Sequence, residues 1–187
     1  MSVTLEGLPW FLPLDRQAYR VGQLIKEAGD ATPAYNLTGR LYLSSHEDKP
    51  WLLLSVPNAL VRGVFDAMHE PGVELPLDRE GRLNAHISVI RPEEIELVGG
   101  PDKFINDRGK PFRYTISRLM EVEPDGWPEM AKVWFLTVHS VDMQMLRRSH
   151  GLTSLPKDGK FDFHITVARR RKAVLGRNEV AKETAPA

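Results

Sequence analysis

Two histidines in strand-like segments are the residues of this chain best suited to chemistry. His86 lies in segment 83–90 (LNAHISVI), and His164 lies in segment 161–168 (FDFHITVA). Imidazole has an unperturbed pKa of about 6.5, so one ring can accept a proton while another donates one at neutral pH. In-line displacement at phosphorus needs such an acid and such a base on opposite sides of the reacting group. We therefore predict that His86 and His164 are a catalytic pair.

A hydroxyl side chain follows each histidine two positions later, Ser88 after His86 and Thr166 after His164. Alternate residues of a strand share a face, so each hydroxyl lies beside its histidine and can donate a hydrogen bond to a phosphate oxygen. A single motif of this kind is more often a packed or surface histidine. Two copies in equivalent settings favour catalysis, and Ser88 and Thr166 are predicted to bind phosphate.

The two histidine segments end two similar successions of elements. Each half is predicted to run strand, strand, helix, strand, which indicates an ancient duplication. If the halves are related by approximate two-fold symmetry, the histidine strands meet in the middle and their polar faces line one cleft. The predicted elements are 40–45, 51–56, 58–69 and 83–90 in the first half, and 112–122, 133–138, 141–150 and 161–168 in the second.

The chain divides into three predicted regions. Residues 1–37, with a helix over 16–28, form an N-terminal cap or extension expected to close the cleft or select the substrate. Residues 38–171 form the catalytic domain, with lobes of about 38–100 and 110–171. The small and polar residues of 172–187 are expected to be a flexible tail.

Composition narrows the functional classes. The chain has 187 residues and no cysteine, which excludes disulfides, thiolate nucleophiles and cysteine-rich zinc sites. Its formal charge is zero, so a long duplex held by phosphate contacts is not favoured. Acidic residues crowd the middle, whereas Arg147, Arg148 and 169–172 make the last third basic, either as a solvated surface or as a site for a small anion. The N-terminus lacks a signal-peptide pattern and no segment is apolar enough to span a bilayer, so we expect a cytoplasmic protein without a membrane or obligatory protein partner.

Four further residues are candidates for substrate binding. Arg170 is predicted on the face of His164, where it reaches a phosphate or lies at the surface. Tyr42, Tyr114 and Trp134 fall in predicted strands and either stack on a base or belong to the core. The remaining histidines lack metal-ligand spacing, and no glycine-rich phosphate loop is present. We therefore predict neither a metal nor another cofactor.

The tripeptides His86-Ile87-Ser88 and His164-Ile165-Thr166 resemble the paired His-x-Thr/Ser motifs of the two-histidine (2H) phosphoesterase superfamily. The resemblance covers roughly residues 38–170, although the first motif has Ser in place of Thr and so lacks the stiffening β-branch. It implies an α+β fold that is bilobal and pseudo-two-fold, with two antiparallel sheets flanking a central cleft and helices outside. It also implies metal-independent cleavage of a nucleotide or short RNA substrate: a 2′,3′-cyclic phosphate, a 2′,5′-oligoadenylate or a cyclic oligonucleotide signal.

Three functional hypotheses follow. The first is an enzyme that opens a 2′,3′-cyclic phosphate with water, or cleaves a 3′,5′ linkage by activating the neighbouring 2′-hydroxyl. The second is a non-catalytic module that sequesters or senses a nucleotide. The third is a structural domain in which the histidines are incidental. The sequence does not distinguish which histidine is the base.

Overall fold

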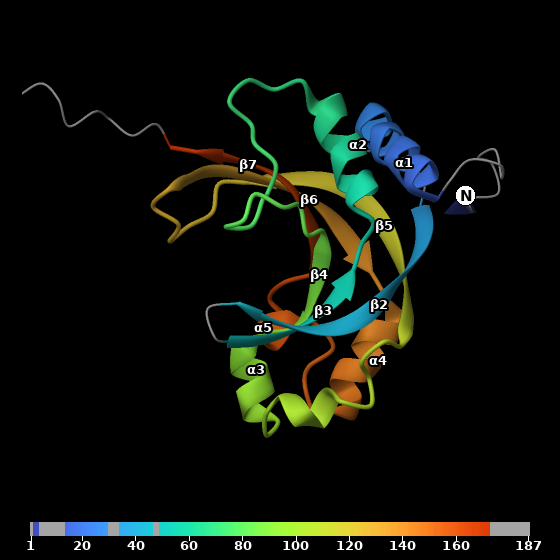
Figure 1. Cartoon of the computed structure of the whole chain (residues 1–187), viewed down its shortest axis with the longest axis vertical. Coiled ribbons are helices and arrows are strands. Elements are labelled where there is room, and N and C mark those ends of the chain that lie inside the picture. The colour runs from blue at the N-terminus through green and yellow to red at the C-terminus, as the bar shows by residue number, and fades with distance from the viewer. Residues whose placement is uncertain (1, 4–13, 30–33, 47–48, 173–187) are drawn as a thin grey trace, which may run out of the picture.

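The strands of this α+β protein form a single sheet with helices at both of its ends. The computed structural model describes residues 2–3, 14–29, 34–46 and 49–172. In Figure 1, α1 and α2 lie together on one side of the strands, and α3, α4 and α5 lie at the opposite end. The elements are β1 (Ser2–Val3), α1 (Leu14–Ala28), β2 (Ala34–His46), β3 (Lys49–Ser55), α2 (Asn58–Met68), β4 (His86–Ile90), α3 (Pro92–Leu97), η3 (Pro101–Phe104), β5 (Pro111–Val122), β6 (Met130–His139), α4 (Val141–Ser149), α5 (Pro156–Gly159) and β7 (Phe163–Arg171).

The long strand β2 joins the two halves of the sheet. Its residues 35–40 pair with β5, and its residues 41–46 pair with β3. Six strands therefore form one antiparallel sheet in the order β4-β3-β2-β5-β6-β7, and β1 pairs with β2 in parallel. The predicted α+β class is confirmed, but the strands make one continuous sheet instead of two. The order strand, strand, helix, strand does occur twice; an origin by duplication stays a prediction.

The two end strands of the sheet, β4 and β7, contact each other. In Figure 1, β4 lies near the centre and β7 extends to the upper left, and four strands separate them in the sheet order. Register shifts interrupt the β3–β4, β5–β6 and β6–β7 pairings, and such bulges increase local twist and bend. The sheet therefore curves far enough to bring the two histidine-bearing strands together.

Two glycines allow α1 and α2 to pack closely. A Cβ atom on Gly22 would lie 2.2 Å from the backbone oxygen of Leu60, and one on Gly63 would lie 2.0 Å from that of Tyr19. The apolar face of α1 is buried in the same core as the sheet. The predicted division of the chain at residue 38 stays a prediction. Of the predicted tail, residues 173–187 lie outside the described residues.

Several predicted boundaries differ from the structure. β2 begins at Ala34, six residues earlier than expected, because buried and exposed side chains already alternate from Tyr35 onward. β4 begins only at His86, and β7 begins at Phe163 and extends to Arg171. Phe161, the first residue of the predicted strand 161–168, precedes β7 and is 49% exposed.

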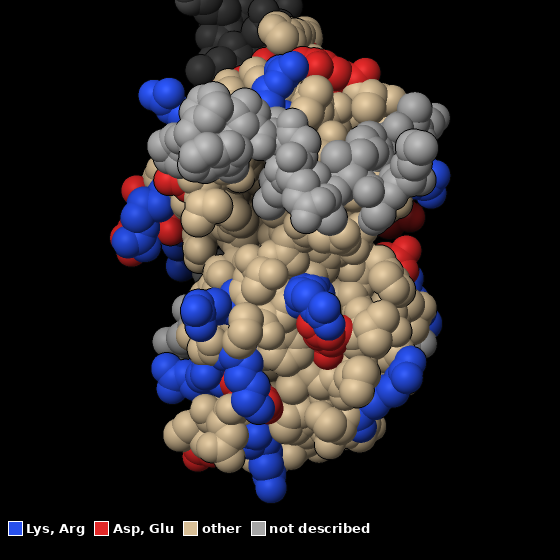
Figure 2. Space-filling view, turned by 90° about the vertical axis from the view of Figure 1, so that its right-hand side faces the viewer, with Lys and Arg blue, Asp and Glu red and all other residues tan. Residues whose placement is uncertain are grey.

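Charged side chains are dispersed on the face of the molecule in Figure 2. Lys and Arg lie there in separate groups, several of them next to Asp or Glu. Equal numbers of acidic and basic residues in the chain are consistent with this mixture. In the described part of the chain, no helix has the length and apolar character needed to cross a bilayer.

Candidate active site

His86 and His164 lie on the same face of the continuous sheet. His86 is opposite Ser55 of β3, and His164 is opposite Thr137 of β6. Directly paired residues share a face, so the register can be followed from strand to strand across the sheet. We call this side the histidine face. Its other polar members in the described strands are Asn36, Thr38, Arg40, Tyr42, Ser44, Lys49, Ser55, Ser88, Arg113, Thr115, Ser117, Arg118, Thr137, His139, Thr166, Arg169 and Arg171.

The opposite face forms the hydrophobic core, which explains why these strands form where they do. Leu54, Ile87, Leu136 and Ile165 alternate with the polar residues and are fully buried. Each histidine strand therefore turns its apolar side chains to the core, which fixes the strand, and its polar side chains to the other side. The predicted alternation in both motifs is confirmed by this burial pattern.

Both histidine rings are anchored in the same way, by the backbone oxygen two residues earlier in the chain. The Nδ1 atom of His86 lies 2.7 Å from the backbone oxygen of Asn84, and that of His164 lies 3.0 Å from the backbone oxygen of Asp162. A carbonyl oxygen only accepts hydrogen bonds, so Nδ1 must carry the proton in each pair. In the neutral ring the lone pair then belongs to Nε2. Each ring is therefore held in the tautomer that can accept a proton at Nε2.

Ser88 and Thr166 each lie two residues after a histidine on the same strand and are half-buried. Ser88 is opposite Leu53 of β3, and Thr166 is opposite Phe135 of β6. The ring of Phe135 also meets His164 edge-on, with centroids 5.5 Å apart and an interplanar angle of 64°. Sequence analysis did not single out Phe135, although its spacing of two from Thr137 in β6 places it on the histidine face.

Tyr42 lies on the histidine face, and it alone of the three aromatic candidates does so. Its hydroxyl donates a 3.5 Å hydrogen bond to the side-chain oxygen of Asn84, the residue whose backbone oxygen anchors His86. Burial raises the pKa of Tyr42 above its ordinary value, so the hydroxyl stays a neutral donor at physiological pH. Tyr42 is thus joined to the first histidine through Asn84.

Tyr114 and Trp134 lie in the core, as the alternative interpretation expected. Each is 2% exposed and points to the face opposite the histidines. Burial raises the pKa of Tyr114, and Trp134 donates its indole N–H to Glu121 at 3.0 Å. Neither ring is available to stack on a base.

The prediction that Arg170 shares the face of His164 is wrong. Phe135 pairs with Thr166 but the preceding residue, Trp134, pairs with Ala168, so β7 has one inserted residue at this point. A one-residue insertion reverses the faces of all later side chains. Arg170 consequently lies over the Trp134 ring at 5.2 Å and donates to Glu70 at 2.9 Å.

Arg147, considered above as part of a basic surface, is completely buried. It forms a bidentate pair with Glu94 of α3, with N–O distances of 2.7 and 2.9 Å. It also donates to the backbone oxygens of Val89, Thr153 and Leu155. Arg147 therefore joins the end of the His86 strand to the segment that leads toward the His164 strand. Charge patterning along the sequence gives no signal for this contact.

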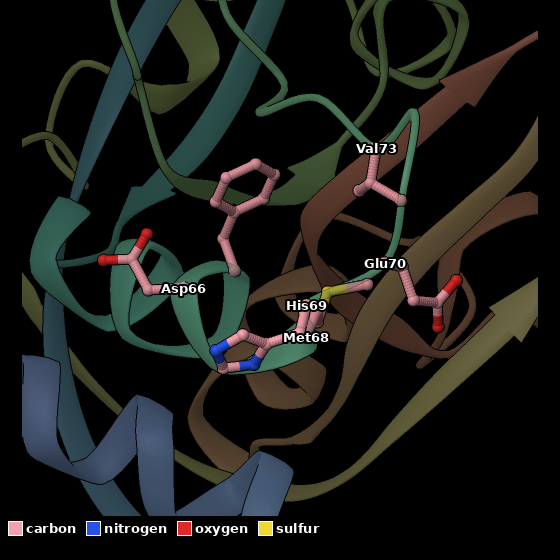
Figure 3. Close-up of a pocket in the computed structure, with 6 residues that line it drawn as sticks. Asp66, Met68, His69, Glu70 and Val73 are labelled. Atoms are coloured by element: carbon pink, nitrogen blue, oxygen red, sulfur yellow. The ribbon is translucent and has the colours of Figure 1, made fainter.

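A surface pocket lies away from the histidine face, at the C-terminal end of α2 (Figure 3). It contains none of the predicted site residues. Glu70, which contributes to it, is the partner of Arg170. Among the side chains that the structure describes, no cluster of three or more His, Asp or Glu could hold a metal ion.

Comparison with known protein families finds a match. The family model of the Swiss Army Knife 2H phosphoesterase domain matches residues 50–174, which include both histidine strands. The chain belongs to this 2H phosphoesterase family, and membership indicates phosphodiester cleavage in general. No curated protein and no solved structure matches the chain significantly.

Proposed function

We propose that this protein is a metal-independent phosphodiesterase in which His86 and His164 act as general acid and base. The observation that carries the proposal is the identical anchoring of the two rings, each with Nδ1 bound to the backbone oxygen two residues earlier. Proton transfer through Nε2 on both sides of one phosphate is the arrangement that in-line displacement requires. The contact between β4 and β7 supports this pairing.

Ser88 and Thr166 complete the proposed site. Each hydroxyl lies two residues after its histidine on the same face. Donated hydrogen bonds to the non-bridging oxygens stabilise the charge that develops during displacement. The same four side chains serve either hydrolysis of a 2′,3′-cyclic phosphate or attack by a neighbouring 2′-hydroxyl.

The proposed substrates are small phosphodiesters of RNA or nucleotides: 2′,3′-cyclic phosphates, 2′,5′-oligoadenylates or cyclic oligonucleotide signals. Hydrolysis of a cyclic phosphate leaves a phosphomonoester, whereas attack by a 2′-hydroxyl leaves a cyclic phosphate. Product analysis therefore separates the two reactions.

The test is a panel of these substrates offered to chelator-treated protein, with His86→Ala and His164→Ala assayed beside the wild type. We expect one substrate class to be cleaved in the presence of chelator and both variants to be inactive on it. His69→Asn is the control, because His69 lies off the histidine face and Asn tolerates its left-handed backbone. Binding of a substrate without turnover by the wild type would overturn the proposal and favour a nucleotide-binding module.

A further inference from the structure

Each histidine belongs to a row of three residues that runs across three neighbouring strands. In the first row, Ser55 of β3 lies opposite His86, and its hydroxyl accepts the backbone N–H of Arg40 of β2 at 2.9 Å. The row is therefore arginine, hydroxyl, histidine. Its three members lie on the histidine face.

The second row repeats this order in the other half of the sheet. Thr137 of β6 lies opposite His164, and its hydroxyl accepts the backbone N–H of Arg118 of β5 at 3.3 Å. Ser117 and Arg118 together oppose Thr137, because Ile116 pairs with Val138 and Leu119 pairs with Leu136. This bulge leaves Arg118 exposed on the histidine face.

Arg40 and Arg118 differ from the basic residues at the end of β7. Among the residues that the structure describes, neither Arg40 nor Arg118 forms an ion pair; the guanidinium group of Arg40 donates a hydrogen bond to the backbone oxygen of Gly109. By contrast, the basic end of β7 is neutralised by Glu70 and Glu74. No Asp or Glu occurs among the described strand residues of the histidine face. Within the described part of the chain, Arg40 and Arg118 are therefore exposed positive charges without an acidic partner.

Each arginine is separated from its histidine by two strand spacings, roughly 10 Å between backbones. The phosphate that reacts is held between the histidines and their hydroxyls, so a group bound by either arginine must lie beyond it. Guanidinium groups bind phosphate with paired, charge-assisted hydrogen bonds. The two equivalent rows offer one such group on each side of the reacting phosphate.

We propose that Arg40 and Arg118 bind the phosphates that flank the cleaved one, so that the substrate class is an oligonucleotide with phosphates on both sides of the reacting linkage. This inference rests on the proposed function and specifies its substrate. A mononucleotide occupies only the central position. An oligonucleotide with a phosphate on each side of the cleaved linkage occupies the central position and both arginine sites.

The test uses three short oligonucleotides that share one cleavable linkage: a dinucleoside monophosphate, its 5′-phosphorylated form, and the form with phosphates at both ends. Each is prepared with 3′,5′ and with 2′,5′ linkages. Turnover is measured as kcat/KM, and Kd is measured separately at several salt concentrations. Arg40→Ala and Arg118→Ala are compared with Arg62→Ala, which removes an exposed charge from α2.

We expect each terminal phosphate to improve wild-type binding and kcat/KM by about tenfold, as a charge-assisted hydrogen bond does. One arginine variant should lose the gain from one end and the second variant the gain from the other. Each variant should also lower the slope of log Kd against log salt concentration by about 0.7. Arg62→Ala should change neither quantity, and Arg40→Lys and Arg118→Lys should retain most of the gain.

Cleavage by the wild type with unchanged preferences in both arginine variants would overturn this inference and leave the proposed function intact. An equal loss on all three compounds would also overturn it, because the arginines would then act on the reacting phosphate or on the fold. Charge-dependent binding without any cleavage would have the opposite meaning. It would support phosphate binding by Arg40 and Arg118 and would contradict the proposed enzymatic activity.

Discussion

At the scale of single residues, the candidate site contains two histidine rings that the backbone just before each ring holds in place. His86 and His164 each donate Nδ1–H to a backbone oxygen two residues earlier. A ring fixed in this way needs no further residue to select its tautomer. In the proposed mechanism, the neighbouring hydroxyls of Ser88 and Thr166 position the phosphate oxygens.

Removing either hydroxyl should lower kcat more than it changes KM. Ser88→Ala and Thr166→Val remove a donor to the charge that develops on phosphate, and we expect losses of about 10²- to 10³-fold. Ser88→Thr and Thr166→Ser keep the hydroxyl and should retain most of the activity. Steady-state kinetics on the cleaved substrate checks this. Equal loss in the conservative variants would show that shape, rather than the hydroxyl, matters.

The residue-scale sequence predictions succeeded where simple alternation persists. The spacing of two between each histidine and its hydroxyl sufficed to place them on one face. The same alternation rule gave the wrong face for Arg170, because nothing in the sequence indicates that one residue is inserted between Thr166 and Ala168. Aromatic residues in strands are equally ambiguous, since alternation alone does not say which face is buried.

At the scale of elements, a buried ion pair joins the end of the His86 strand to the segment that leads toward the His164 strand. Arg147 of α4 has all its N–H groups engaged by Glu94 and by three backbone oxygens on β4 and the 153–155 segment. Sequence analysis had placed Arg147 in a basic region, because its partner is 53 residues away. Burial of a charge can be inferred from sequence only when its partner is also known.

Arg147→Met should destabilise the protein strongly, because it leaves Glu94 buried without a counterion. Breaking such a pair costs about 3–5 kcal/mol. Arg148→Ala, at the neighbouring exposed position, should change the free energy of unfolding by about 0.5 kcal/mol or less. Urea unfolding at pH 7 measures both. Similar values for the two variants would contradict a structural role for the pair.

The same pair should make stability depend on pH in the acid range. Burial raises the pKa of Glu94, but hydrogen bonds and the charge of Arg147 outweigh it, so this pKa lies below its ordinary 4.5. Because the folded pKa is the lower one, the stabilisation is complete above about pH 4.5 and is lost as pH falls through the folded pKa. Urea unfolding between pH 7 and 3 should show this loss in the wild type. Glu94→Gln should lack this part of the pH dependence, and an unchanged profile in that variant would contradict the assignment.

At the scale of the whole molecule, the sheet and its helices share one core. Sequence analysis recovered the repeated order of elements but separated the sheet into two, because the pairing of β2 with both β3 and β5 is not visible in a local pattern. It also assigned residues 1–37 to an extension. The buried side chains of α1, such as Val21 and Ile25, belong to the common core.

A chain that begins at residue 38 should therefore fail to fold. It lacks α1 and the first residues of β2, and so exposes the apolar face of α2 to water. We expect loss of near-UV circular dichroism and of a cooperative urea transition. A chain that begins at residue 14 keeps α1 and should unfold cooperatively. Native-like unfolding of the shorter chain would instead support an independent domain from residue 38.

The proposed action of the two histidines as a pair also belongs to the scale of the whole molecule, since it requires opposite ends of the sheet to meet. The most direct test is the kcat of His86→Ala, His164→Ala and the double variant on the cleaved substrate. We predict that each single variant loses about 10²- to 10⁴-fold, and that the double variant loses far less than the product of the two, as residues acting as a unit do. If either single variant keeps wild-type kcat, or if the two losses simply multiply, the paired mechanism is contradicted.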